Sequence, residues 1–211
     1  MENEKLETNE NNVQADNKDK TKSLLKDILE ILESSIITVF TIVMVFTYLL
    51  HPVNVVGESM VPTLNDKDKI FMSMITADIS YGDIVVINND ASYMLGSSGE
   101  VIKRDSAQFN ECIIKRVIAC GGQTIDINFD NGTVTVDGEV LDEPYIAALT
   151  TKNQGAFQFP LTVPEGYYFV MGDNRNKSTD SRSPYVGLIK KEQIYGKALV
   201  RYGPLSEFKI L

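Results

Sequence analysis

The fold of the chain is decided by residues 111–136, which read ECIIKRVIACGGQTIDINFDNGTVTV. Branched apolar residues alternate there with polar ones, and two glycine-containing sequences, Gly121-Gly122 and Asn131-Gly132, interrupt the alternation. Alternation with a period of two residues is typical of half-buried β-strands, and an Asn-Gly pair between two such runs is a strong hairpin signal. The stretch therefore predicts one extended strand through IIKRVIA, followed by a β-hairpin over TIDINFDNGTVTV.

Short runs rich in Val, Ile, Tyr and Phe recur through the rest of residues 52–211, separated by turn sequences such as Tyr81-Gly82-Asp83. They are KIFM (69–72), DIVVIN (83–88), GTVTVDGEVL (132–141), YYFVM (167–171) and GKALVRY (196–202). No long helical period follows residue 51. We therefore expect a mostly β chain, with a single all-β domain of sheets or partial barrels over residues 52–211.

The first 51 residues have a different character. Residues 1–22 are polar and charged and hold almost no large apolar side chains, so we expect a disordered tail. From Ser23, leucines and isoleucines recur at helical spacing, and the pattern continues into IITVFTIVMVFTYLL at 36–50. We predict a helix over residues 23–51 that is amphipathic at its start and apolar on every face towards its end.

The apolar part of this helix is suited to a membrane. The 17 residues 34–50 carry no charge, and they span about 26 Å, slightly less than the ~30 Å hydrocarbon core of a bilayer. The alternatives are a buried core helix and a cleavable signal peptide. The run is apolar all round and no A-x-A-like cleavage site follows it, so we predict one permanent transmembrane anchor.

The orientation of the anchor follows from its basic residues. Four lysines between residues 18 and 26 precede the apolar run, and no Lys or Arg follows it before Lys67. The positive-inside rule therefore predicts a cytoplasmic N-terminus and an extracytoplasmic domain after about residue 51.

Composition narrows the chemistry further. The net charge of −9 gives no support for nucleic-acid binding, which needs a concentrated basic face. Cys112, Cys120 and the single histidine, His51, do not form a convincing zinc site. The two cysteines end the predicted strand about 26 Å apart, beyond the ~7 Å reach of a disulfide. We expect two free thiols, interpreted as small buried residues, and no metal or cofactor.

Few catalytic mechanisms suit this composition. A Ser-His-Asp triad needs a histidine base, and His51 lies at the predicted membrane boundary. Proteolysis by two carboxylates stays open, although no carboxylate motif stands out. A serine paired with a lysine remains, and it requires a lysine whose pKa lies far below the usual ~10.4.

Lys115 is the candidate for such a lysine. In the predicted strand it shares one face with Ile113 and Val117, an apolar setting that disfavours the charged ammonium. Arg116 lies on the opposite face, where we expect a structural ion pair. On pattern alone, a surface lysine on an edge strand is the alternative.

Two further segments are candidates for the site. Residues 55–62, VVGESMVP, run from a β-branched strand through Gly57 and Ser59 to Pro62, so the serine lies in a turn that can present its hydroxyl to a groove. Residues 171–182, MGDNRNKSTDSR, are dense in hydrogen-bonding groups. The plain interpretation of this cluster is a solvated loop, and the functional one is a set of groups that orient the base.

These three clusters together resemble the type I signal peptidase family of Ser/Lys serine proteases, with a Gram-positive-like pattern. GESMVPTL is similar to its nucleophile box, IIKRVIA to its lysine box and GDNRNKSTDSR to its polar box, in the family's order over roughly residues 36–203. The resemblance implies an all-β signal-peptidase-like catalytic domain. After the lysine box, many members read G-x-P-G-D where this chain has ACGGQ at 119–123, which leaves loop geometry open.

The resemblance also implies roles for individual residues. Ser59 is the expected nucleophile and Lys115 the expected general base. Ser178 is expected to hydrogen-bond the lysine amine, and Asp180 and Arg182 are expected to form a supporting ion pair. Asp173 and Arg175 are expected to have structural roles. Gly57 stands where some members have an oxyanion-binding serine, so the oxyanion hole is expected to use backbone N–H groups, including that of Ser59.

The expected function is that of a membrane-anchored serine endopeptidase that removes signal peptides from secretory preproteins through an acyl-enzyme. Implied partners are preproteins with small residues at positions −1 and −3, the lipid bilayer and, as a candidate, the translocation machinery. Two rival hypotheses remain: another member of the Ser/Lys superfamily, and an anchored β-domain that binds exported proteins without cutting them.

Overall fold

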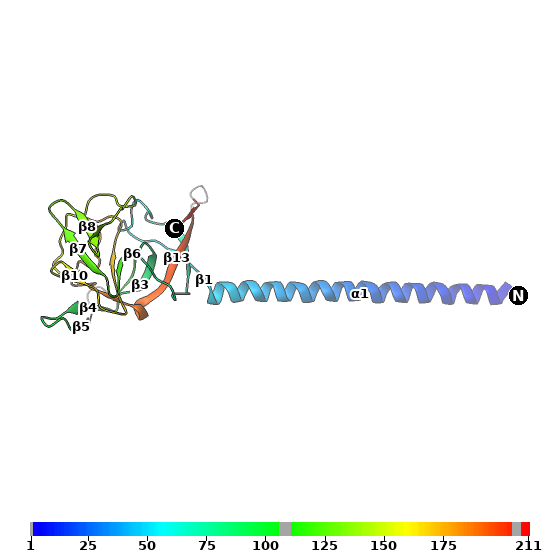
Figure 1. Cartoon of the computed structure of the whole chain (residues 1–211). Coiled ribbons are helices and arrows are strands. Elements are labelled where there is room, and N and C mark those ends of the chain that lie inside the picture. Colours follow the sequence, from blue (N-terminus) through cyan, green and yellow to red (C-terminus); the bar gives the residue numbers. More distant parts are fainter. Residues whose placement is uncertain (1, 106–110, 204–207) are drawn as a thin grey trace. The chain divides into compact units, whose positions relative to one another are not determined.

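The computed structural model describes residues 2–105, 111–203 and 208–211 (Figure 1). The chain divides into two compact units, Met1–Tyr48 and Leu49–Leu211. The first consists of one helix and the second of β-strands, which confirms the predicted mostly β chain behind a single N-terminal helix.

The helix α1 runs from Glu2 to Tyr48 and differs at both ends from the predicted boundaries. Residues 2–22, predicted to be disordered, are helical here, because neither Pro nor Gly interrupts the chain before Pro52. The predicted helix end at residue 51 is three residues too late. Pro52 favours an extended conformation at His51, and the strand β1, Leu50–Asn54, begins there instead.

The apolar segment of α1 is long enough to cross a membrane. It comprises the 27 residues Lys22–Tyr48. No residue of its most apolar stretch is buried. At about 1.5 Å per residue this segment is roughly 40 Å long, but Asp27, Glu30 and Glu33 lie within it, so its uncharged part is no longer than the sequence indicated. The exposed apolar surface supports a single-pass anchor and disfavours the buried core helix.

The second unit contains three sheets in the described residues. An eight-stranded sheet has the order β1, β2, β13, β3, β6, β11, β12, with β14 paired to β13. A four-stranded sheet has the order β10, β7, β8, β9, and β4 and β5 form a hairpin of their own. All of the recorded strand pairs are antiparallel.

The bounds of these elements follow the chain. The large sheet consists of β1 with β2 (Lys69–Ser73), β3 (Ile84–Asn88), β6 (Cys112–Cys120), β11 (Tyr167–Met171), β12 (Ile189–Lys190), β13 (Ile194–Gly203) and β14 (Lys209–Ile210). The remaining strands are β4 (Ala91–Leu95), β5 (Val101–Asp105), β7 (Thr124–Asn128), β8 (Thr133–Val136), β9 (Glu139–Val140) and β10 (Leu161–Thr162). A 3₁₀ turn, η1, covers Lys191–Gln193.

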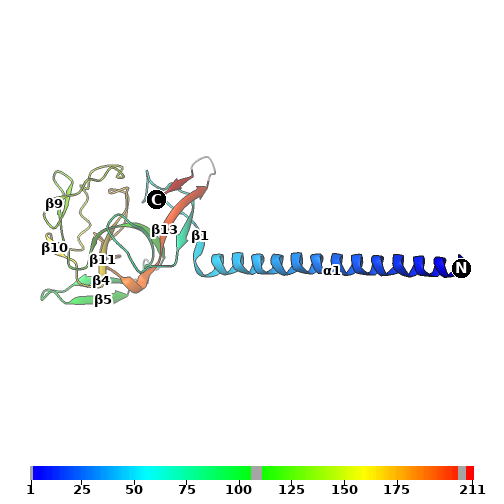
Figure 2. The same ribbon diagram turned by 45° about the vertical axis from the view of Figure 1, so that its right-hand side comes forward.

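The strands predicted from the sequence are confirmed, including the β7–β8 hairpin around Asn131-Gly132. The second view shows the large sheet curling strongly, with the four-stranded sheet at the end of the unit away from β1 and β13 (Figure 2). The long polar stretch before the lysine strand contains the β4–β5 hairpin, which the sequence did not indicate because its strands are short and partly charged.

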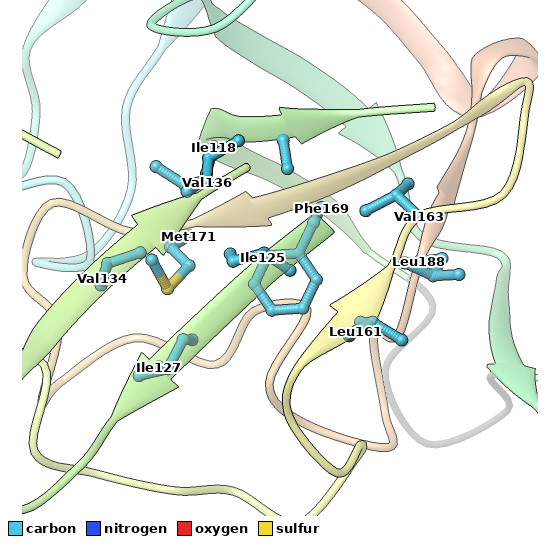
Figure 3. Packing of buried hydrophobic residues seen from close by; sticks show 11 residues of the cluster. Ile118, Ile125, Ile127, Val134, Val136, Leu161, Val163, Phe169, Met171 and Leu188 are labelled. Atoms are coloured by element: carbon cyan, nitrogen blue, oxygen red, sulfur yellow. The ribbon is translucent and has the colours of Figure 1, made fainter. Parts of the chain in front are cut away.

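The main core lies between the two larger sheets. Phe169 of β11 is fully buried, and side chains of β6, β7, β8 and β10 surround it (Figure 3). A smaller cluster, which includes Val55, Met60 and Leu64, lies under the predicted nucleophile segment. Burial of these side chains fixes both ends of the segment that carries Ser59.

Strand β6 has partners on both edges over only part of its length. Residues 112–116 pair with β3, whereas β11 pairs only from Arg116 to Cys120. Among the described strands, none pairs with the second edge of residues 112–115. This open half of β6 lies beside the candidate site.

Candidate active site

Ser59 and Lys115 meet across a groove. Lys115 Nζ lies 2.9 Å from Ser59 Oγ and 2.8 Å from the carbonyl oxygen of Ile114, to which it also donates. The lysine is only 3% exposed, although it carries an amine. The alternative of a surface lysine is therefore wrong. Lys115 is buried, as its position between Ile113 and Val117 in the alternating strand predicted.

Burial changes the protonation of Lys115. Removal of the ammonium from water lowers the pKa of Lys115 from 10.5 to about 8, against the opposing charges of Asp180, Asp173 and Glu111. A buried amine without a direct carboxylate partner is easier to deprotonate than a surface lysine. Its free lone pair can then accept the proton of a nearby hydroxyl.

Ser59 is held in a tight turn. The carbonyl of Glu58 accepts a hydrogen bond from Val61 N, at 3.2 Å, so that Ser59 is the second residue of the turn. Gly57 precedes it with a φ of 89°, a left-handed conformation that favours glycine. The Gly57 N–H donates to Asp66 Oδ1 at 2.9 Å, so this amide is already engaged.

Asp180 and Arg182 form the buried ion pair expected from the resemblance. Arg182 Nε and Nη2 each donate to one carboxylate oxygen of Asp180 at 2.8 Å, and both residues are fully buried. Burial alone would raise the pKa of Asp180, but the hydrogen bonds and charge of Arg182 hold that pKa below its usual value. Asp180 Oδ2 also accepts from Gly172 N at 3.0 Å, which ties the pair to the end of β11.

Ser178 does not make the expected contact in this structure. Its Oγ is buried and has no hydrogen-bond partner of good geometry among the described residues, while Lys115 Nζ donates to Ile114 O instead. The hydroxyl lies close enough to Asp180 to help lower its pKa. Ser178 therefore lies beside the Asp180–Arg182 pair and makes no hydrogen bond to Lys115 Nζ.

A second polar network lies on the other face of β6. Arg116 donates to both oxygens of Asp173, at 2.8 and 2.6 Å, and stacks 4.0 Å above the ring of Tyr145. Thr63 Oγ1 donates to the same carboxylate at 2.5 Å. Arg175 pairs with Glu143. These contacts agree with the structural roles implied for Asp173 and Arg175.

Sequence reasoning missed two residues of the site. Asn174 donates from its backbone N to Ser59 O at 3.0 Å and from Nδ2 to Glu58 O at 3.1 Å. Gly172 lies so close to Ser59 O and Ser178 Oγ that a Cβ on it would overlap both. Both residues belong to the polar cluster at residues 171–182. Their residue types alone did not indicate that they contact Ser59.

The groove beside Ser59 and Lys115 has a volume of about 480 Å³. Its walls are residues 53–60 and 111–115, with Lys177 and Thr179 at the rim. Cys112 lies in this wall and is exposed, so its interpretation as a buried residue is wrong, while Cys120 at the far end of the strand is half-buried. Both thiols are free, as predicted.

The fold and the site define a class of protein. A β-domain follows an apolar, membrane-length helix, and its groove holds a serine hydroxyl within hydrogen-bond distance of a buried lysine amine. The single histidine, His51, lies in β1 opposite Met72. This is the architecture of a membrane-anchored serine hydrolase with a lysine in place of histidine.

The comparison with known families is specific. The family model described as signal peptidase, peptidase S26, matches residues 28–203. The chain belongs to this family, and it is accordingly an enzyme of the signal peptidase type, as the resemblance implied.

Curated relatives agree with this assignment. The chain is 34% identical over 191 residues to signal peptidase I of Bacillus amyloliquefaciens, covering 86% of this chain and 91% of the relative. It is 31% identical to signal peptidase I S of Bacillus subtilis, covering 91% and 98%, and 31% identical to signal peptidase IB of Staphylococcus aureus, covering 87% and 94%. A crystal structure of a signal peptidase I from Enterococcus faecalis is 26% identical, with a TM-score of 0.41 over 57% of this chain and 96% of that one.

Proposed function

We propose that this protein removes N-terminal signal peptides from exported preproteins, with Ser59 as the nucleophile and Lys115 as the general base. The observation that carries the assignment of these two residues is the 2.9 Å separation of Ser59 Oγ and Lys115 Nζ. Among the described residues, this amine has no carboxylate within hydrogen-bond distance that would hold its proton.

The chemistry follows from this pair. Neutral Lys115 takes the Ser59 proton while Ser59 Oγ forms a bond to the scissile carbonyl carbon. The tetrahedral intermediate collapses, the C–N bond breaks, and the lysine ammonium returns the proton to the leaving amine of the mature protein. Water then attacks the acyl-enzyme while Lys115 takes its proton, the ester bond to Ser59 breaks, and the lysine ammonium returns the proton to Ser59 Oγ.

The open half of β6 is the proposed binding edge for the preprotein. An extended peptide there can pair with the backbone of residues 112–114, as an added strand. The apolar side chains of Val55, Val86 and Ile113 line the groove at this edge. Shallow apolar walls admit small side chains, which supports the preference for small residues at positions −1 and −3.

The membrane anchor supplies the proposed location. Four lysines between residues 18 and 26 precede the uncharged residues 34–50, and no Lys or Arg follows these before Lys67, which favours a cytoplasmic N-terminus and an extracytoplasmic catalytic domain. Preproteins leaving the translocation machinery would reach the enzyme on that side, so the bilayer and the translocation machinery are proposed partners.

The test uses the full chain in lipid vesicles with a preprotein that carries an A-x-A site. The wild type should release the mature protein, and Ser59→Ala should release none. A Ser73→Ala variant is a matched control, because Ser73 ends β2 outside the groove lining. Binding of the preprotein without cleavage by the wild type would support the rival binding module, and cleavage by Ser59→Ala would refute the nucleophile.

A further inference from the structure

Asn174 contacts both peptide groups that flank the Ser59 Cα. Its side-chain Nδ2 donates to the carbonyl of Glu58 at 3.1 Å, and its backbone N donates to the carbonyl of Ser59 at 3.0 Å. One residue of the polar loop therefore fixes the carbonyl directions before and after the nucleophile.

These contacts determine where the Ser59 N–H points. The peptide group is planar and trans, so the N–H of Ser59 points away from the carbonyl of Glu58. That carbonyl is directed at Asn174 Nδ2 and Val61 N, on the inside of the turn. The Ser59 N–H is thus directed outwards, and none of the described residues accepts a hydrogen bond from it.

The loop that presents Asn174 is itself rigid. Its neighbour Asp173 is fully buried between Arg116 and Thr63. On the other side, Arg175 Nε donates to Gly172 O at 3.2 Å, and Arg182 Nη2 donates to Arg175 O at 2.6 Å. Asn174 therefore projects from a backbone that buried ion pairs hold in place.

We propose that Asn174 is a positioning residue that orients the Ser59 N–H as an oxyanion donor, through its hydrogen bond to the Glu58 carbonyl. The inference rests on the proposed function, because it assigns a role in the same acyl transfer. A donor aimed in advance at the developing oxyanion stabilises the transition state more than the bound substrate.

Lys177 offers a contrast at the same residue. Its Nζ lies 3.3 Å from Glu58 Oε2, but both side chains are more than 60% exposed. An exposed ion pair contributes little, and it holds the Glu58 side chain instead of its carbonyl. Loss of Lys177 should therefore leave the direction of the Ser59 N–H unchanged.

The experiment compares Asn174→Ala and Asn174→Asp with Asn176→Ala in the full-length protein. Asn176 is a matched control, because its Nδ2 donates to Leu149 O, away from Ser59. Aspartate has nearly the shape of asparagine but no N–H to donate. We measure kcat and KM for preprotein cleavage, the pH profile, the Tm, and inhibition by a peptide aldehyde that adds to Ser59.

Both Asn174 variants should lower kcat by about 10- to 100-fold, less than removal of a donor outright. KM should stay as in the wild type. The pH at which activity falls should also stay the same in Asn174→Ala, which adds no charge, whereas the new carboxylate of Asn174→Asp should move it upwards. Affinity for the aldehyde should fall by the same factor as kcat/KM, since its hemiacetal oxygen occupies the oxyanion position. Asn176→Ala should behave like the wild type, because Asn176 contacts Leu149 O and lies outside the groove lining.

Wild-type kcat in Asn174→Asp at the high-pH plateau would overturn the inference, and so would a change confined to KM or a shifted pH profile in Asn174→Ala. If the alanine variant fails to fold, as Tm and circular dichroism would reveal, the aspartate variant decides alone. Failure of the proposed function is a separate result, in which the wild type itself shows no Ser59-dependent cleavage.

Discussion

Lys115 and Arg116 are adjacent buried cations on β6, and their surroundings are opposite. Arg116, on one face, is paired with both oxygens of Asp173 and lies over the Tyr145 ring. Lys115, on the other face, bonds a hydroxyl and a backbone carbonyl, and no carboxylate among the described residues. Burial acts to lower the pKa of both, but the bonds to Asp173 reverse the effect for Arg116 and raise its pKa.

The difference teaches how one strand can separate stability from chemistry. A buried cation that is bonded to both oxygens of a carboxylate keeps its proton and cross-links the fold. A buried cation without a carboxylate partner has a lowered pKa and loses its proton more easily. The pairing of β6 follows a similar division: β11 covers one edge of residues 116–120, and among the described strands none covers that edge at residues 112–115, where it faces the groove.

The largest expected effect comes from making Lys115 resemble its neighbour. Lys115→Arg keeps the charge, but a guanidinium does not give up its proton at accessible pH. Cleavage of the preprotein should fall by about 10²- to 10⁴-fold, the contribution of a general base. Initial rates under saturating substrate measure this, and activity within tenfold of the wild type would show that another group is the base.

Breaking the Arg116 pair should cost stability. Asp173→Ala leaves a buried guanidinium without its carboxylate, at a cost of about 3–5 kcal/mol in the free energy of unfolding. Thermal or denaturant unfolding of the β unit measures the loss. A parallel Glu58→Ala variant removes an exposed ion pair and should change stability by less than about 1 kcal/mol. Equal losses for both would remove the distinction between the two kinds of pair.

Replacing Lys115 with an apolar side chain should stabilise the protein while abolishing activity. The pKa of Lys115 falls from 10.5 to about 8 on folding, so the unfolded chain binds the proton more tightly. This disfavours folding by about 3 kcal/mol below pH 8, and the penalty fades as pH rises towards 10.5.

Lys115→Met should therefore raise the Tm by roughly 6–12 °C at pH 7 and have little effect near pH 10.5. Scans of the variant and the wild type at both pH values measure the difference. A variant less stable than the wild type at pH 7 would indicate that the amine stabilises the fold.

The two halves of β6 also differ in a way that thiol reagents can probe. Cys112 is exposed in the groove, whereas Cys120 is half-buried and burial raises the pKa of its thiol. A bulky maleimide should modify Cys112 first and slow preprotein cleavage severalfold by blocking the open edge. Cys112→Ser should make the enzyme resistant to the reagent; inhibition of that variant would locate the effect elsewhere.

Much of this comparison was predictable from the sequence. The alternation of β6 placed Lys115 and Arg116 on opposite faces, because side-chain direction in a strand depends only on sequence parity. The apolar neighbours of Lys115 predicted its burial. The order of the three boxes, compared with the signal peptidase family, identified the segment that carries Ser59.

Other features depended on contacts that no local pattern encodes. Ser178 was expected at the lysine amine, but Ile114 O takes that place, and a backbone carbonyl leaves no trace in a sequence. Asn174 reaches Glu58 across 116 residues of chain. The early start of α1 was not predicted, because a polar composition indicates only that a segment has little apolar surface to bury. Residues 2–22 contain no Pro or Gly, so nothing in them breaks a helix.

The central claim is that Lys115 acts as a neutral base because it is buried without a carboxylate partner. The most direct test is the pH dependence of kcat/KM for the full-length enzyme. The value should reach a plateau at high pH and fall tenfold per pH unit below about pH 8, where the Lys115 pKa lies. A rate that stays constant down to pH 6 would contradict it.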